Sequence, residues 1–458
     1  MRESPFRASM IIEICQSDQA VLPQSPSPEV PSGLIALMGQ RRFAPLFWVQ
    51  SLGAFNDQVF KTGLLTLLTF RLADELGLNA SLHNTIGAAL FILPFALFAP
   101  TAGQLADGMD KAKMMRFVKG CEVILMILAA LAYQLQSLTF LYVLLFLMGA
   151  QSAMFAPIKY GILPQYMREN ELISANGLIQ GATFLAILIG QIAGAKLILS
   201  DAGVTIIGAV VVGVAIIGFI ASLFTPSAPP LGPAPKVDWF FPRAMWDVIV
   251  AGRKVPKAYE AILAIAWFWF VGATFLTLLP PYAKEALNGN EDVFILLLAT
   301  FSIGVAIGAV LCGKIFGSEA RVRTAAWGAG GIALFSMLLW VFTGFYQIGN
   351  DVGRQTELFS IDRFLSDASA WYILICFALL AACAGLYLTP VNVVLQVESP
   401  PNERGRFIAC SNTIDAVVMT ISAGLSAGLT AAGLDQASIF ALVGATGFFA
   451  AIWAQRHR

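Results

Sequence analysis

The chain has 458 residues, of which 58% are hydrophobic and only 12% are charged, and its mean hydropathy is +0.75. About a quarter of the residues of a soluble domain are charged, so this composition excludes an ordinary soluble domain. The 28 basic and 28 acidic residues balance, so no bulk electrostatic attraction draws the chain to nucleic acid, and we expect no nucleic-acid partner.

The N-terminal region differs from the rest of the chain. It contains the Pro- and Ser-rich stretch VLPQSPSPEVPSG, and we predict a disordered tail over residues 1–42. We expect no cleavable signal peptide, because the first long apolar segment starts near Ala44 and is too long to be one.

Apolar segments of about 20 residues then recur to the end of the chain. Such segments are typical of membrane-spanning helices, which satisfy their own backbone hydrogen bonds in lipid. We therefore predict an all-α polytopic membrane protein with twelve transmembrane helices. The predicted spans are 44–70, 85–106, 114–133, 138–158, 173–199, 203–224, 258–283, 292–316, 323–346, 370–393, 406–431 and 436–454.

A Pro-rich break separates the sixth span from the seventh. It predicts a six-helix bundle over 43–224, a cytoplasmic linker over 225–257 and a second six-helix bundle over 258–458. The second part of the linker carries Trp239, Phe240 and Trp246 among basic residues. This mixture is typical of a short helix that lies in the membrane interface.

Basic residues indicate how the spans are oriented, because Lys and Arg are enriched on the cytoplasmic side of a membrane. One set of alternate segments holds 22 of the 28 Lys and Arg residues, including Lys111 to Lys119 at the start of the third span. The other set holds four. The asymmetry predicts that both termini and the linker are cytoplasmic, and it supports an even number of spans.

The two halves resemble each other in sequence. GQLADGMDKAKMM after the second span matches GKIFGSEARVR after the eighth, and FAPIKYGILPQY at the end of the fourth matches LTPVNVVLQVE at the end of the tenth. Lys159 and Asn392 occupy equivalent positions in the second pair. Two six-helix halves in parallel repeat are the layout of major facilitator transporters.

GQLADGMDKAK resembles the loop signature of the major facilitator superfamily, with Asp110 at a position where that family usually has Gly. Three further stretches, SLGAFNDQVFK, FAPIKYGILPQ followed by ANGLI, and TPVNVVLQ, resemble the bacterial lysophospholipid transporters. The resemblance covers nearly the whole chain after about residue 40. One departure lies in the seventh span, where family members carry an Arg in the cavity and the matching place in this chain, within GATFLTLLPPY, is near Leu276.

The resemblance implies a specific activity. Such proteins would move lysophosphatidylethanolamine and similar lipids from the outer to the inner leaflet of the bacterial inner membrane, by alternating access. The implied partners are the lysophospholipid substrate, membrane lipids and a cytoplasmic acyltransferase on a separate chain. We expect a monomer without a cofactor.

Polar residues within the first span are candidates for a substrate site. Asp57 and Lys61 lie one helical turn apart, deep in an apolar segment, and a charge at that depth is costly unless it faces a cavity or a partner. One interpretation pairs Asp57 with Lys61 as a structural unit. The other places both in a central cavity, where they meet a head group or a coupling ion. Asn56 lies on a different face of the helix from Asp57 and Lys61, from which it can contact a neighbouring span.

Polar residues near the ends of the fourth and tenth spans extend the candidate site. Lys159 is either a lysine that reaches the membrane interface or a phosphate contact, as the resemblance implies. Asn392 and Gln396 either face the same cavity or form ordinary hydrogen bonds between helices. We therefore predict a substrate site formed by Asp57, Asn56, Lys61, Lys159, Asn392 and Gln396.

The loop after the second span is the candidate gate. In the superfamily, the residues that match Gly103, Asp107, Lys111 and Lys113 form contacts that hold the cytoplasmic side closed; the alternative is that the lysines only set the topology. Asp415 in the eleventh span and Glu398 at the end of the tenth are candidates for coupling to protons or ions.

Small residues in two spans predict close helix packing: Gly190 and Gly194 in the fifth span, and Gly424 and Gly428 in the eleventh. Catalytic and metal-binding motifs are rejected. The stretches GAVLCGKI and GLSAG, which partly match a P-loop and a nucleophile elbow, lie within apolar helices rather than after strands. The six cysteines show no metal-binding spacing.

The sequence thus predicts a lysophospholipid transporter rather than an enzyme. Two other functions stay open: a proton-coupled carrier of a small solute or drug, and a membrane partner of an acyltransferase that does not itself transport.

Overall fold

The computed structural model describes residues 34–72, 79–317, 322–352 and 357–456. Most of the tail predicted over 1–42 lies outside this part of the chain. Three α-helices in the described part are short, namely α2 (Leu34–Met38), α10 (Phe241–Arg253) and α14 (Ile361–Ser366), and three shorter helical turns are η1 (Leu68–Leu72), η2 (Glu169–Glu171) and η3 (Tyr282–Ala286).

Twelve helices are long, with at least 21 residues each, which confirms the predicted all-α fold with twelve spans. The first six are α3 (Ala44–Leu67), α5 (Ala80–Gly108), α6 (Lys111–Gln134), α7 (Leu138–Tyr166), α8 (Leu172–Leu199) and α9 (Gly203–Leu223). The second six are α11 (Pro256–Pro281), α12 (Glu291–Phe316), α13 (Val322–Gly349), α15 (Ala368–Glu398), α16 (Arg404–Ala431) and α17 (Gln436–Arg456).

Ten of these helices are long and apolar enough to cross a membrane, and the two exceptions are α3 and α6. Both exceptions carry charged residues inside an otherwise apolar sequence, such as Asp57 in α3 and Glu122 in α6. Large apolar side chains such as Ile217 and Phe449 are exposed on the outside of the molecule. An apolar outer surface of this kind suits contact with lipid.

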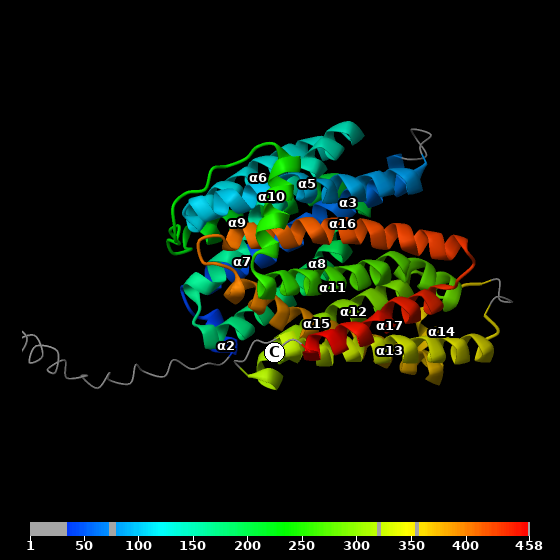
Figure 1. The fold of residues 1–458 in the computed structure, drawn as a ribbon. Coiled ribbons are helices and arrows are strands. Elements are labelled where there is room, and N and C mark those ends of the chain that lie inside the picture. Colours follow the sequence, from blue (N-terminus) through cyan, green and yellow to red (C-terminus); the bar gives the residue numbers. More distant parts are fainter. Residues whose placement is uncertain (1–33, 73–78, 318–321, 353–356, 457–458) are drawn as a thin grey trace, which may run out of the picture.

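The long helices run side by side and form two bundles (Figure 1). In the first bundle, α3 packs on α8, α5 on α7 and α6 on α9; in the second, α13 packs on α17, α12 on α15 and α11 on α16. The bundles meet mainly where α5 contacts α16 and α8 contacts α12. These two contacts are equivalent to each other under the sequence repeat, because they join the second and fifth helix of one half to the fifth and second of the other.

The structure extends several helices beyond the predicted spans, and two of these extensions include a candidate site residue. The predicted span 138–158 is part of α7, which runs to Tyr166, and 370–393 is part of α15, which runs to Glu398. Prolines such as Pro157 and Pro390 lie inside these helices. A membrane helix tolerates proline because neighbouring groups compensate for the lost backbone hydrogen bond. Lys159 and Asn392 therefore lie within helices rather than at their ends.

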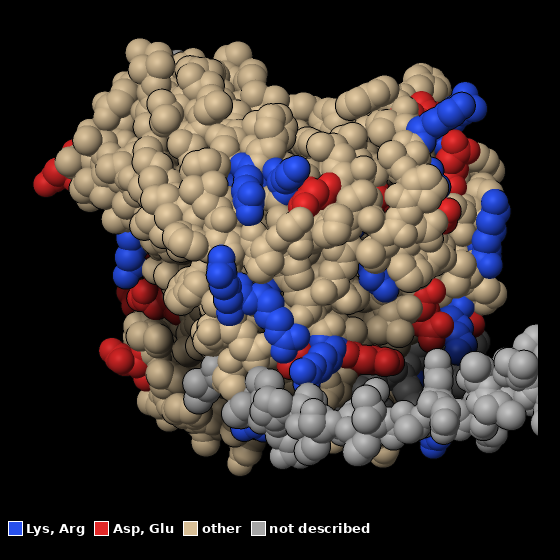
Figure 2. Space-filling view, turned by 90° about the vertical axis from the view of Figure 1, so that its left-hand side faces the viewer, with Lys and Arg blue, Asp and Glu red and all other residues tan. Residues whose placement is uncertain are grey.

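The start of the linker lies against the first bundle, whereas α10 packs on α16 of the second bundle and on α5 of the first. The start is held by Asp110, which accepts hydrogen bonds from the Ser227 hydroxyl at 2.5 Å and the Ala228 N–H at 3.3 Å. Further along, the Asp238 N–H donates to Gln104. We call the end of the bundles at which the linker lies the linker end, and Figure 2 shows that Lys and Arg side chains gather on this face. The predicted domain limits at 43–224, 225–257 and 258–458 stay a prediction.

Close packing depends on glycine at several helix contacts. A Cβ added at Gly190 or Gly194 of α8 would lie 2.6 or 2.7 Å from a carbonyl oxygen of α3, so the predicted packing face is confirmed there. The same prediction is wrong for Gly424 and Gly428, where an added Cβ would meet nothing within 4 Å. Small residues in α16 therefore do not mark a helix contact at those positions.

A tight contact between two helices of the second bundle yields a stability prediction. At Gly308 of α12, an added Cβ would collide with the carbonyl oxygen of Ala382 in α15. Gly308→Val should therefore lower the free energy of unfolding by about 3 kcal/mol or more, at the upper end of the usual cost of overpacking. Gly424→Val is the matched control and should change it by less than about 0.5 kcal/mol. Thermal unfolding in detergent tests this, and equal melting temperatures for the two variants would contradict it.

Candidate functional site

A cavity lies between the two bundles, in two parts that share several lining residues. The larger part has a volume of ≈ 370 Å³ and the smaller, nearer the linker end, ≈ 160 Å³. The residues that line both parts are Phe95, Ala156, Lys159, Tyr160, Gln180, Trp269, Asn412 and Asp415. Ligand pockets of about 300–1,000 Å³ hold drug-sized molecules, so the cavity has the size of a binding site.

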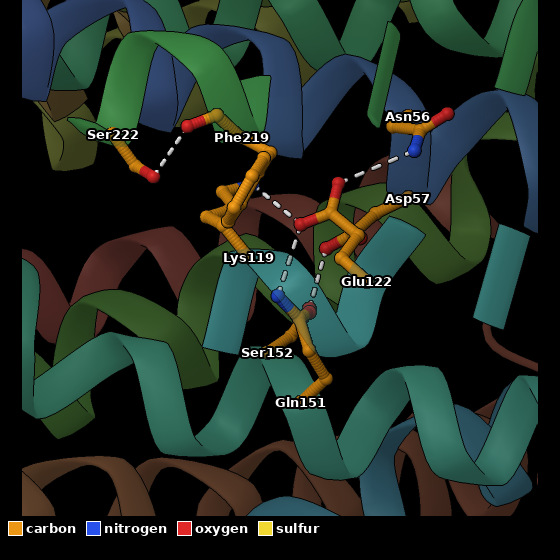
Figure 3. Close-up of polar contacts among 8 residues, drawn as sticks. All are labelled: Asn56, Asp57, Lys119, Glu122, Gln151, Ser152, Phe219 and Ser222. Atoms are coloured by element: carbon orange, nitrogen blue, oxygen red, sulfur yellow. Dashed lines mark hydrogen bonds and ion pairs between the residues drawn. The ribbon is translucent and has the colours of Figure 1, made fainter. Parts of the chain in front are cut away.

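A buried network of polar groups forms one wall of the cavity. Lys119 and Glu122, three residues apart on α6, form an ion pair with an N–O distance of 2.5 Å, and each is at most 2% exposed. Glu122 also accepts hydrogen bonds from Asn56 at 3.2 Å and Gln151 at 3.0 Å (Figure 3). The buried carboxylate is thus satisfied by one cation and two amides, which offsets the cost of removing it from water.

Asp57 joins this network to the cavity. Its carboxylate accepts a hydrogen bond from the Ser152 hydroxyl at 2.7 Å, and Ser152 lies next to Gln151 on α7 (Figure 3). Lys61 lies with its amine 5.2 Å from the centre of the Phe91 ring. Among the described residues, no ion pair within 4.0 Å joins Asp57 to Lys61. Both side chains line the cavity.

Asn56 has a different position from its neighbour Asp57. It is fully buried and is not among the residues that line the cavity. Its amide holds Glu122 instead of facing a substrate. We expected Asn56 in the substrate site, and the structure places it behind the wall, where it orients a group that does line the cavity.

Lys159 lines both parts of the cavity, and its amine lies 4.8 Å from the centre of the Tyr160 ring. Asn392 and Gln396 of α15 line the part nearer the linker end. Gln396 exchanges two hydrogen bonds with Asn176 of α8, at 3.0 and 2.8 Å. Gln396 therefore also joins the two bundles, whereas Asn392 bonds within its own helix.

Asp107 and Gly103 of the predicted gate lie where the bundles meet at the linker end. Asp107 accepts hydrogen bonds from the N–H groups of Gly405 and Arg406, at 2.7 and 3.0 Å. These N–H groups belong to the first turn of α16, where the helix dipole favours a negative charge. Gly103 allows the approach, because a Cβ there would lie 2.6 Å from the carbonyl oxygen of Gly405. These contacts join the two bundles at the linker end.

The two lysines of the predicted gate differ from each other. Lys111 is 1% exposed and lies close to Gly161 of α7, whereas Lys113 is exposed. Asp110 caps the start of α6 by accepting hydrogen bonds from the N–H groups of Ala112 and Lys113. Burial acts to raise the pKa of Asp110, but its hydrogen bonds to Ser227 and to backbone N–H groups outweigh burial and hold that pKa below its ordinary value. Asp110 is thus a linker anchor.

The two candidate coupling acids are in different surroundings. Asp415 of α16 lines both parts of the cavity and is 7% exposed. Glu398 forms an ion pair with Lys257 at 3.6 Å, and both side chains are partly exposed at the linker end. Leu276, near the position where the resemblance implies an Arg, is 40% exposed and is not among the residues that line the cavity.

The sequence reasoning missed four residues of the wall, namely Lys119, Glu122, Gln151 and Ser152. It counted Lys119 among the basic residues that mark the cytoplasmic side, but the structure buries that side chain in the first bundle. The available signal was the pair of opposite charges three residues apart, Lys119 and Glu122, within an apolar segment.

Two six-helix bundles around a cavity that both polar and apolar side chains line define the fold of a secondary transporter. Residues 49–352 match the family described as Major Facilitator Superfamily, and the chain belongs to that family. It is a polytopic membrane protein whose relatives and fold are those of transporters, not enzymes.

The chain is similar to curated proteins named lysophospholipid transporter LplT. The protein of Serratia proteamaculans (strain 568) is 27% identical over 392 residues, which cover 84% of this chain and 87% of that protein. The protein of Klebsiella pneumoniae (strain 342) is 25% identical over 428 residues, which cover 87% and 97%.

Solved structures share the fold at lower identity. The transporter FucP in the outward conformation aligns with a TM-score of 0.67 at 14% identity, over 91% of this chain and 99% of that one. The human organic anion transporter MFSD10 aligns with a TM-score of 0.67 at 13% identity, over 91% and 99%. These likenesses establish the fold.

The buried ion pair of the wall yields a second prediction. Glu122→Gln leaves Lys119 buried without its counter-ion, which should lower the free energy of unfolding by about 3–5 kcal/mol. The double variant Lys119→Met with Glu122→Gln removes both charges and should recover most of that loss. Unfolding in detergent tests this, with the exposed Glu291→Gln as control. A double variant no more stable than Glu122→Gln would contradict it.

The contact of Asp107 with α16 yields a third prediction. Asp107→Asn loses a charged acceptor, and such hydrogen bonds contribute about 1.5–3 kcal/mol. The ratio of molecules open to those closed at the linker end should therefore rise at least about tenfold. Spin labels at positions 168 and 402, both exposed, measure the distance between the bundles at this end in a background without the native cysteines.

The matched control for this prediction is Asp110→Asn. Asp110 lies three residues further along, but it caps α6 and holds the linker without joining the bundles. We expect its distance distribution to equal that of the parent protein. An unchanged distribution for Asp107→Asn would show that the contact with α16 does not hold the gate closed.

Proposed function

We propose that this protein moves lysophospholipids, of which lysophosphatidylethanolamine is the representative, to the cytoplasmic leaflet of the bacterial inner membrane by alternating access. The observation that carries the proposal is the composition of the cavity, in which unpaired charged groups and apolar side chains line one space. An amphiphile with a charged head and an apolar tail suits such a lining. The relatives named lysophospholipid transporter LplT support the same substrate class.

The head group would meet the charged residues that form no ion pair with another described residue. Lys61 and Lys159 offer amines to a phosphate, and Asp57 offers a carboxylate to an ammonium group. Each of these charges lies in a cavity of low polarity, where charge-assisted hydrogen bonds are stronger than in water. Glu122 and Lys119 already neutralise each other, so we assign them to the support of the site.

The acyl chain would lie along the apolar part of the lining. This part includes aromatic side chains such as Phe91, Phe155 and Phe184, together with Met419 of α16. The larger part of the cavity, at ≈ 370 Å³, suits a head group and a portion of a chain. The remainder of the chain would extend between helices into the surrounding lipid.

The direction of transport rests on the orientation of the chain. The Lys and Arg residues that gather at the linker end (Figure 2) support a cytoplasmic position for that end and for both termini. With the linker end closed by Asp107, the cavity would then accept substrate from the outer side. A lysophospholipid that reaches the inner leaflet is a substrate for re-acylation, and we assign that reaction to an acyltransferase on a separate chain.

Uptake of labelled lysophosphatidylethanolamine by reconstituted vesicles tests the proposal, with and without imposed ion gradients. We expect transport by the wild type and a loss of at least about tenfold in both Asp57→Asn and Lys159→Gln, because a buried charged hydrogen bond contributes about 1.5–3 kcal/mol. The matched control is Lys196→Gln, which removes an exposed lysine of α8.

Each outcome decides between named alternatives. Absence of transport by the folded wild type would overturn the proposal and favour the proton-coupled carrier of a small solute. Equal transport by wild type and both variants would keep the substrate and remove Asp57 and Lys159 from the site. Transport that requires a proton gradient would identify a coupled carrier of lipid.

A further inference from the structure

The second bundle contributes one charged side chain to the described lining of the cavity, Asp415 of α16. Its Oδ2 accepts a hydrogen bond from the Ser411 hydroxyl at 3.3 Å, but its Oδ1 is buried without a hydrogen-bond partner in the described part of the chain. A carboxylate oxygen in this position is expensive unless a cation or a donor reaches it. Asp415 therefore has the chemistry of a ligand contact.

Two donors beside Asp415 are also without partners. The Asn412 side chain lies three residues before it on α16, and Gln180 lies across the cavity on α8. Their amide nitrogens are buried and make no hydrogen bond to a described residue, and Gln180 is only 5% exposed. One unpaired acceptor and two unpaired donors thus line one cavity, which native proteins avoid unless a ligand or water completes them.

The same part of the cavity contains an amine and an indole ring. Lys159 lines it from the first bundle, and Trp269 lines it from α11 of the second. A lysine and two amide donors are suited to phosphate oxygens, while a carboxylate beside an indole is suited to an ammonium group. These are the two charged halves of a phosphoethanolamine head group.

The total charge of the lining supports a zwitterion rather than an anion. Its described basic residues are Lys61, Lys119 and Lys159, and its described acidic residues are Asp57, Glu122 and Asp415. A site for a net anion favours an excess of positive charge. Equal numbers of both signs suit a molecule that carries one charge of each.

We propose that Asp415, Asn412, Gln180 and Trp269 form a second head-group subsite, in which Asp415 binds the primary ammonium group while Lys159 binds the phosphate. The inference rests on the proposed function and refines it. Asp415 and Lys159 belong to different bundles, so the head group joins the two. It therefore binds most tightly when the bundles bring both residues near it, and such a difference in affinity between states is what allows a substrate to bias a conformational change.

The experiment compares two lysophospholipids with the same acyl chain. Lysophosphatidylethanolamine carries the ammonium group, and lysophosphatidylglycerol carries the same phosphate without it. In reconstituted vesicles, Asp415→Asn should reduce transport of the first by about 10- to 100-fold and change transport of the second less than threefold. Asp362→Asn, which removes an exposed carboxylate of α14, is the control and should resemble the wild type for both lipids.

The results separate the inference from the proposed function. If the folded wild type transports neither lipid, the proposed function fails and the subsite fails with it. If the wild type transports both, and Asp415→Asn loses both equally, the function stands and the ammonium subsite is overturned.

A binding measurement on the wild type keeps the inference testable if Asp415→Asn does not fold. Calorimetric titration compares lysophosphatidylethanolamine with its N-acetyl derivative, in which the nitrogen carries no charge. We expect the derivative to bind at least tenfold more weakly. Equal affinities would overturn the subsite.

Discussion

The ion pair between Lys119 and Glu122 is the constraint on which the wall of the cavity depends. Two charges inside a helix bundle are stable only if each is surrounded by partners, and here Asn56 and Gln151 bind the carboxylate that Lys119 neutralises. The buried Lys119 amine also requires glycine at position 53 of α3, because a Cβ at Gly53 would lie 2.6 Å from that amine. Helices α3, α6 and α7 are therefore fixed relative to one another.

This rigidity positions the groups that face the cavity. The Ser152 hydroxyl lies 3.3 Å from the Gln151 side-chain oxygen and 2.7 Å from the Asp57 carboxylate, so Asp57 is oriented by a residue whose neighbour is itself fixed by Glu122. A binding group held by such a second layer of contacts loses little entropy when a ligand arrives. The second bundle is built differently, since its core contains stacked aromatic rings among aliphatic side chains, with the ring centroids of Phe275 and Phe440 4.2 Å apart.

The fold was predictable from the sequence because lipid restricts the alternatives. An apolar segment of about 20 residues has few options besides a spanning helix, and the repeat between the halves supplied the arrangement. Helix ends were less predictable: the fourth span was predicted to end at residue 158, but α7 continues past Pro157 to Tyr166, since a membrane helix tolerates proline where neighbouring groups compensate for it. Glycines in the sequence were also an ambiguous sign of helix packing, since Gly190 lies at a helix contact and Gly424 does not. Whether a glycine lies at such a contact depends on the position of the neighbouring helix.

The candidate site was predictable in part for the same reason. Asp57 and Lys159 were predictable because each is a charged residue within a largely apolar stretch or a distinctive sequence motif. Both line the cavity. Asn56 stood beside Asp57 in the sequence, but a rotation of about 100° per residue directs it to another helix. Lys119 was counted with topology signals because it follows other lysines. Its buried partner Glu122 is evident from spacing alone, but the amides that complete the network come from α3 and α7 and depend on tertiary packing.

The contacts that close the linker end differ in kind from those of the wall. Asn176 and Gln396 join the bundles through two hydrogen bonds between neutral amides, and Asp107 joins them through backbone N–H groups of α16. Amides and helix ends that separate find water as a replacement partner, so opening this end leaves none of these polar groups without a hydrogen-bond partner. The difference in free energy between the closed and open states is thereby kept small enough for a substrate to shift. The same chain thus confines its costly charge pair to one rigid bundle and leaves exchangeable hydrogen bonds where the bundles must move apart.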